Sequence, residues 1–152
     1  MDISSADIDL VIRLSSAILL GGLIGFEREL HGKVAGFRTH SLVALGSALI
    51  MLVSVQIFDL YQGKAQVDPS RIAAQVVSGV GFLGAGAIIR FPRGEHEAVK
   101  GLTTAAGIWA ASGIGLACGL GQYHPAIIST LLTLVILVVF SKINRLFHGR
   151  DA

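Results

Sequence analysis

The stretch LTTAAGIWAASGIGLACGL, residues 102–120, decides the fold class of this chain, and none of its residues is charged. Crossing the ~30 Å hydrocarbon core of a bilayer takes ~20 helical residues with a rise of ~1.5 Å each. The stretch therefore has the length and the composition of a membrane-spanning helix.

Four further segments have the same apolar character, namely residues 8–26, 41–60, 72–89 and 123–143. Charged residues make up only 14% of the 152-residue chain, whereas soluble domains usually carry about 25%. We therefore expect one all-α domain, a polytopic membrane helix bundle with five transmembrane helices.

The lysines and arginines are distributed unevenly between the two sides of such a bundle. Those at the ends of the first, third and fifth segments are Arg28, Lys33, Arg38, Arg90, Arg93, Lys100, Lys142, Arg145 and Arg150. The other side has Lys64 and Arg71. Because cytoplasmic loops carry the excess of positive charge, we expect the N-terminus outside and the C-terminus in the cytoplasm.

The third segment contains a G-x-G-x-x-G pattern, residues 79–84. In a dinucleotide-binding fold this pattern follows a strand and opens a helix, but here it lies inside an apolar span. The sequence also lacks a dense basic run, and it has a single cysteine and five scattered histidines. We therefore expect no nucleotide, nucleic-acid or metal site, no cofactor and no enzyme activity.

Small residues recur at helical spacing within the spans, as they do where membrane helices pack closely. They form one stripe in the first span (Ala17, Gly21, Gly25), two in the third (Ala74, Ser78, Gly81, Ala85 and Gln75, Gly79, Gly86) and one in the fourth (Thr104, Gly107, Ala111, Gly115, Cys118). We assign helix packing to Gly21, Gly25, Gly79, Gly81, Gly84, Gly86 and Gly107. We expect the third span to be central, the fifth peripheral, and Cys118 to be a packing residue.

Three side chains are the candidates within the membrane: Arg13, Gln75 and Cys118. Arg13 lies near the start of the first span, so its long side chain can reach the membrane surface. The alternative is a buried arginine that faces the bundle, since it continues the stripe of small residues.

The stretch GFERELHGKVAGFRTH, residues 25–40, is the richest in polar residues. It has two interpretations. One is a membrane-interface anchor with weak surface ion pairs, such as Glu29 with Lys33. The other is a partly buried network at the cytoplasmic face, formed by Glu27, Arg28, Glu29 and Arg38, with Thr39 and His40 opening the second span.

Several blocks together resemble the MgtC/SapB family of bacterial membrane proteins. They are LGGLIGFERE (20–29), AGFRTHSLVALGSALI (35–50), DPSRIAAQVVSGVGFLGAGAIIR (68–90) and GLTTAAGIWAASGIGLACGLGQY (101–123). The family's characteristic positions correspond to Glu27, Arg28, Glu29, Gly36, Arg38, Thr39, His40, Gly81, Gly84, Gly86, Arg90, Thr103 and Thr104.

The resemblance implies an inner-membrane protein tied to growth under Mg²⁺ limitation, acid tolerance or survival inside host cells. Members of the MgtC type are linked to restraint of the F-type ATP synthase. Those members carry a soluble domain after the fifth span, whereas this sequence stops at Ala152 and resembles a short member.

These observations predict an accessory or regulatory membrane protein. Its expected partners are lipid, other membrane proteins (by resemblance the F-type ATP synthase) and a second copy of the chain, without nucleic acid. The alternative is a transporter or channel for Mg²⁺ or another small solute. Transporters bury ionisable groups near the midplane, where these spans have glycines and Gln75 but no acid.

Overall fold

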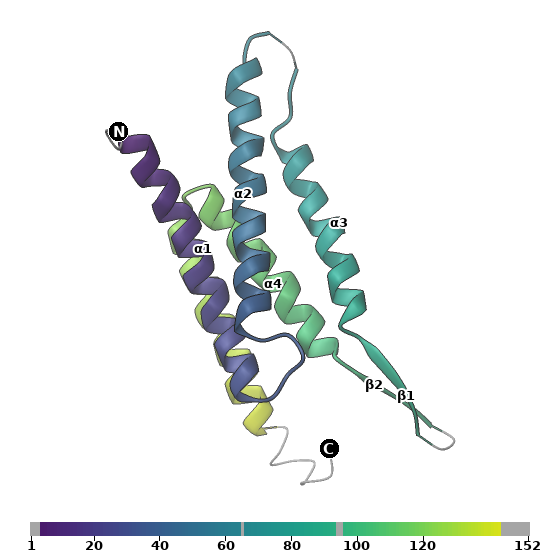
Figure 1. The fold of residues 1–152 in the computed structure, drawn as a ribbon. Helices are drawn as coiled ribbons and strands as arrows, with labels where there is room; N and C mark the ends of the chain where they lie inside the picture. The colour runs from purple at the N-terminus through teal and green to yellow at the C-terminus, as the bar shows by residue number, and fades with distance from the viewer. Residues whose placement is uncertain (1–3, 65, 94–95, 144–152) are drawn as a thin grey trace.

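The computed structural model describes residues 4–64, 66–93 and 96–143, without the side chains of residues 89–93 and 96–98. Its helices are α1 (Ser5–Leu30), α2 (Phe37–Tyr61), α3 (Ser70–Gly86), α4 (Leu102–Gly119) and α5 (Tyr123–Val135), and a π-helical turn, η1 (Ile136–Phe140), continues α5. The all-α bundle predicted from the sequence is confirmed (Figure 1).

Four helices in the described chain are long and apolar enough to cross a membrane: α1, α2, α4 and α5 with its continuation to Ile143. α3 has 17 residues and so a length of ~26 Å, slightly less than the ~30 Å of a bilayer core. The third predicted span therefore exists as a helix but ends three residues earlier than expected.

A short antiparallel hairpin follows α3, where the sequence predicted only helix and loop. Its strands are β1 (Ile89–Arg93) and β2 (His96–Lys100), and Ile89 pairs with Lys100. Glycine weakens the end of a helix and β-branched residues favour strands. The chain therefore leaves the helix after Gly84 and Gly86 and enters β1 at Ile89.

α4 is the central helix, because it packs against α1, α2, α3 and α5 (Figure 1). α3 packs against α2 and α4 and leans away from α1. The prediction that the third span is central is therefore wrong. α5 packs against α4 and α1 and exposes most of its apolar side chains, as expected for the peripheral helix.

Helices α1, α2 and α4 approach each other so closely that Gly21, Gly25, Gly115 and Gly119 cannot be replaced without displacing backbone. A Cβ atom on Gly21 would lie 2.8 Å from the His40 oxygen, and one on Gly25 would lie 2.6 Å from the Gly36 oxygen. On α4, a Cβ on Gly115 would lie 2.8 Å from the Ala44 Cα. The small stripes predicted for the first and fourth spans are thus confirmed as packing surfaces.

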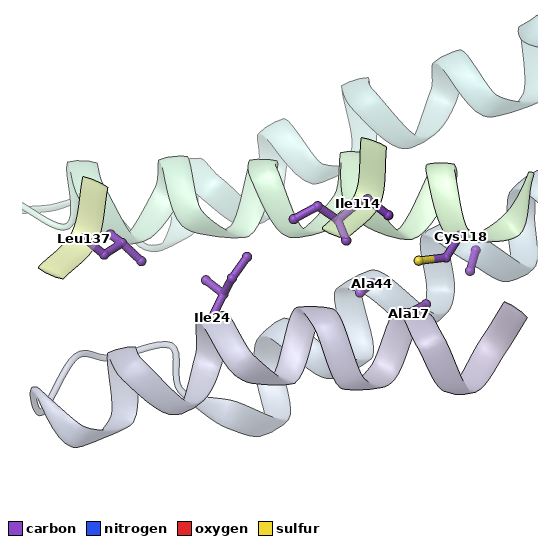
Figure 2. Packing of buried hydrophobic residues seen from close by; sticks show 8 residues of the cluster. Ala17, Ile24, Ala44, Ile114, Cys118 and Leu137 are labelled. Atoms are coloured by element: carbon purple, nitrogen blue, oxygen red, sulfur yellow. The ribbon is translucent and has the colours of Figure 1, made fainter. Parts of the chain in front are cut away.

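The side chains between these helices form a continuous apolar core. Figure 2 shows Ile24 of α1 pointing toward the elements that carry Ile114 and Leu137, while Ala17, Ala44 and Cys118 fill the narrower part. Cys118 is fully buried in this cluster, which is the place expected of a packing residue.

α3 uses a different face from the two stripes predicted for it. Its buried residues are Val76, Val80 and Gly84, which recur every four positions, and a Cβ on Gly84 would lie 3.6 Å from the Ala105 Cβ. Within the described chain no atom lies within 4 Å of a Cβ built on Gly79, Gly81 or Gly86. The packing role predicted for these three glycines is therefore wrong within one copy of the chain, because the larger valines give α3 its contact.

Candidate functional site

The turn between α1 and α2 holds the polar groups of the candidate site. α1 ends at Leu30 and the chain reverses at Gly32, whose φ of 62° favours glycine. The Lys33 amide donates to the Arg28 oxygen at 3.0 Å, and the Gly32 amide donates to the Glu29 oxygen at 3.0 Å. This pair of bonds satisfies the last carbonyls of α1 and fixes the direction in which α2 begins.

Glu27 and Arg28 are buried at the end of α1, with only 8% and 4% of their surface exposed. Arg28 Nη1 lies 3.4 Å from Glu27 Oε2, and His31 Nδ1 lies 3.0 Å from Glu27 Oε1. The Glu27 carboxylate therefore has a cationic partner on each oxygen when His31 is protonated. Removing one partner from such a buried pair leaves the other uncompensated.

Glu29 has a separate task, although it stands only two residues from Glu27. Its Oε2 accepts a hydrogen bond from the Phe37 amide at 2.8 Å, at the first turn of α2. Gly36 makes this approach feasible, because a Cβ there would lie 2.5 Å from the same oxygen. Among the described residues Glu29 and Lys33 form no ion pair, so the pair expected from their spacing is not made.

His40 lies in the interior where α1, α2 and α4 meet, and none of its surface is exposed. Its Nδ1 lies 3.0 Å from the Gly36 oxygen. A Cβ built on Gly107 of α4 would lie 3.2 Å from His40 Nε2. Gly107 therefore packs in contact with the ring, and His40 Nε2 has no hydrogen-bond partner among the described residues.

The set that we call the turn cluster consists of the buried Glu27, Arg28 and His40 and of the exposed His31, which contacts Glu27 from the end of α1. Glu27 and Arg28 are the two charged side chains that act electrostatically on the His40 ring. His31 was missed as a site residue, although its spacing of four from Glu27 is the signal that could have found it.

Other predicted site residues lie outside the turn cluster. Arg38 and Thr39 are exposed, and Arg38 forms no ion pair within the described chain. Thr103 is exposed and Thr104 is buried at the start of α4. Arg90 belongs to β1, but its side chain lies outside the described part of the structure.

Arg13 faces the bundle at the opposite end from the turn cluster. Its Nη1 donates to the Gly119 oxygen at 2.9 Å, and its Nε lies 2.7 Å from Asp9 Oδ2. A cation at this place satisfies a carbonyl at the C-terminal end of α4, where the helix dipole is negative. Of the two interpretations of Arg13, the structure favours the one in which it binds to the bundle. Gln75 is exposed on α3.

The loop before α3 carries a further carboxylate with defined partners. Hydrogen bonds from the Ser70 hydroxyl and amide to Asp68 Oδ1, at 2.6 and 2.8 Å, hold the pKa of Asp68 below its usual value. In the described residues no group of three or more His, Cys, Asp or Glu side chains could hold a metal ion.

Comparison with known proteins places this arrangement in a family. The MgtC family model matches residues 14–146. The chain is 46% identical over 138 residues to "Putative magnesium transporter YhiD" of Escherichia coli (strain K12), covering 90% of this chain and 62% of that protein. It is 46% identical over 124 residues to "Protein MgtC" of Salmonella typhimurium (strain LT2), covering 82% of this chain and 49% of that protein.

The chain thus spans about half to three-fifths of the length of these curated relatives. No solved structure matches it. The apolar helices and the family match together identify a multi-pass membrane protein. The resemblance noted from the sequence blocks is confirmed, and the chain belongs to the MgtC family.

Proposed function

We propose that this chain is an accessory protein of the bacterial inner membrane that regulates other membrane proteins by direct helix contact, in the adaptation of the cell to low Mg²⁺. The magnesium link rests on the family and on the name of the Escherichia coli relative. The proposed role requires no catalysis and no cofactor.

The observation that carries the proposal is the outer face of α3, by which we mean the stripe Ala74, Gln75, Ser78, Gly81 and Ala85. The bulky Val77, Phe82 and Leu83 are exposed beside this stripe. All five residues of the stripe are exposed. The exposed face of α5 instead carries bulky apolar side chains, among them Ile128, Leu131 and Leu132. Small and weakly polar residues are typical of helix–helix interfaces in membranes rather than of surfaces that face lipid.

The rival proposal is a transporter for Mg²⁺ or another small solute, which the name of the Escherichia coli relative favours. A pathway for a hard cation needs oxygen ligands along the bundle. Two observations favour the contact role. Helices α1, α2 and α4 are in close contact. The middle of the described spans, between the level of Arg13 at one end and that of Glu27 at the other, has no acidic side chain.

Gly81→Leu tests the contact role, because it fills the outer face of α3 where one copy of the chain has open space. We expect this variant to reach the membrane in normal amounts and to fail to restore growth at limiting Mg²⁺ in a strain that lacks the native gene. Gly113→Leu is the matched control, since the space beside Gly113 on α4 is equally open.

Full growth with Gly81→Leu, or equal loss with both variants, would contradict the assignment of α3 as the contact surface. A Mg²⁺ uptake assay, with the purified chain in liposomes that contain a Mg²⁺-sensitive dye, distinguishes the transporter proposal from the contact role. Mg²⁺ uptake that depends on the protein would replace the contact role with transport.

A further inference from the structure

His40 is an ionisable residue enclosed by three helices at the cytoplasmic end expected from the charge distribution. It belongs to α2 and is fully buried. Gly21 of α1 lies against its backbone, and Gly107 of α4 lies against its ring. Any change in the size, charge or hydrogen bonding of this ring therefore acts on the packing of α2 with α4.

The hydrogen bond to Gly36 fixes which ring nitrogen carries the proton. A carbonyl oxygen can only accept, so Nδ1, at 3.0 Å from the Gly36 oxygen, must be the donor. In the neutral ring the lone pair is then on Nε2, which has no partner among the described residues. A buried acceptor without a donor is unusual, since the large majority of buried polar atoms are paired.

The charges around the ring come from α1. Glu27 and Arg28 both act on His40, but the Glu27 carboxylate already has Arg28 and His31 as partners. The turn of α4 that faces the ring, residues 104–107, contains no ionisable side chain. On α2 itself, Arg38 is exposed. A protonated His40 would therefore add a second cation beside the buried Arg28.

We propose that His40 is a proton-binding site whose occupation loosens the contact between α2 and α4. The proton comes from water and binds to Nε2. It turns a lone pair that rests against Gly107 into an N–H group that requires an acceptor. Because none of the His40 surface is exposed to solvent and Gly107 lies against Nε2, the charged ring is hydrated only when α2 and α4 separate.

The consequence is a bundle whose core packing responds to the acidity of the compartment that the turn faces. A histidine whose unperturbed titration lies within the pH range 5–8 is suited to such a response. The glycine contacts between Ala44 and Gly115 and between Ala48 and Gly119 lie along the same α2–α4 interface. Loosening at His40 therefore extends to the rest of the interface.

The test compares thermal unfolding of the purified full chain in detergent at about pH 8 and about pH 5. We expect the unfolding temperature of the wild type to fall by about 4 °C or more on acidification. His40→Asn keeps an amide donor for the Gly36 oxygen but cannot be protonated, so most of the fall should disappear. His124→Asn, at an exposed histidine on α5, is the matched control and should behave as the wild type.

Nuclear magnetic resonance of the wild type, with ¹⁵N-labelled histidine and a water-soluble paramagnetic agent, supplies a measurement that needs no variant. One histidine should be shielded from the agent and carry its proton on Nδ1 at about pH 8. It should become doubly protonated over the pH range in which stability falls. An unchanged pH response in His40→Asn, or a shielded ring that stays neutral to about pH 5, would overturn the proposal.

Discussion

Glu27 and Glu29 stand two residues apart, and their carboxylates have different partners. Glu27 lies inward with Arg28 and His31, whereas Glu29 accepts a hydrogen bond from the Phe37 amide. Their spacing puts them on different faces of α1, since successive helical residues rotate by about 100°. The polar stretch thus combines the ion pairs of Glu27 with a hydrogen bond that caps α2, whereas the network interpretation of the sequence placed both acids in one network.

Glu27→Gln tests the cluster, because it leaves the buried Arg28 without its carboxylate. We expect a loss of about 2 kcal/mol or more in the free energy of unfolding in detergent, since an uncompensated buried charge is costly. Arg38→Gln should change it by less than about 0.5 kcal/mol, as for most exposed positions. Equal losses with the two variants would restore Arg38 to the cluster and contradict the structure.

Residue type and spacing predicted that residues 25–40 are special, but not which side chains meet. Arg38 and His40 are neighbours in sequence, yet Arg38 is exposed and His40 is fully buried. Which face of α2 turns inward depends on the reversal at Gly32 and on the contacts of Gly21 and Gly25. Only the three-dimensional structure shows these contacts. His31 was missed because it follows the last residue of α1, so its spacing of four from Glu27 was not read as a contact on a helix.

At the scale of helices, the same kind of small-residue stripe has two outcomes. The stripes of α1 and α4 lie in contact with backbone, whereas those of α3 face open space. Spacing predicts that such a stripe favours close approach, but it does not say whether the neighbour belongs to the same chain. α3 was therefore misplaced at the centre, although its existence and its start were predicted correctly to within two residues.

A matched pair of substitutions distinguishes the two kinds of glycine. Gly115→Ala places a methyl group 2.8 Å from the Ala44 Cα, and it should destabilise the bundle by about 1–3 kcal/mol, as overpacking does. The methyl group added by Gly81→Ala contacts no other atom. This change should leave the free energy of unfolding the same or raise it by up to about 1 kcal/mol, because alanine favours helix. Thermal unfolding in detergent measures both, and a destabilising Gly81→Ala would mean that α3 is packed more closely than described.

At the scale of the molecule, composition predicted the all-α bundle and the hydropathy pattern predicted its five helices. Successive connections lie at alternate ends of the bundle. The α1–α2 turn and the hairpin lie at one end, and the α2–α3 connection lies at the other (Figure 1). The hairpin escaped prediction because Ala87, Ile88 and Ile89 are as apolar as the helix before them.

Reporter fusions test the orientation of the whole bundle. A reporter that is active only in the cytoplasm should be active when fused after residue 150 and silent when inserted beside Gly63, in the loop after α2. The reason is the excess of lysine and arginine at the ends of the first, third and fifth spans. Activity at Gly63 and silence at residue 150 would reverse the assignment of the two sides.

The central position of α4 has a consequence for how the protein is made. The ribosome delivers α1, α2 and α3 to the membrane before the helix that all of them pack against. Until residue 119 has emerged, the groove between α1 and α2 has no helix to fill it, and the His40 ring lacks Gly107 beside it. The newly inserted chain therefore passes through a stage in which the His40 ring and the α2 surface at Ala44 and Ala48 lack the α4 glycines that cover them.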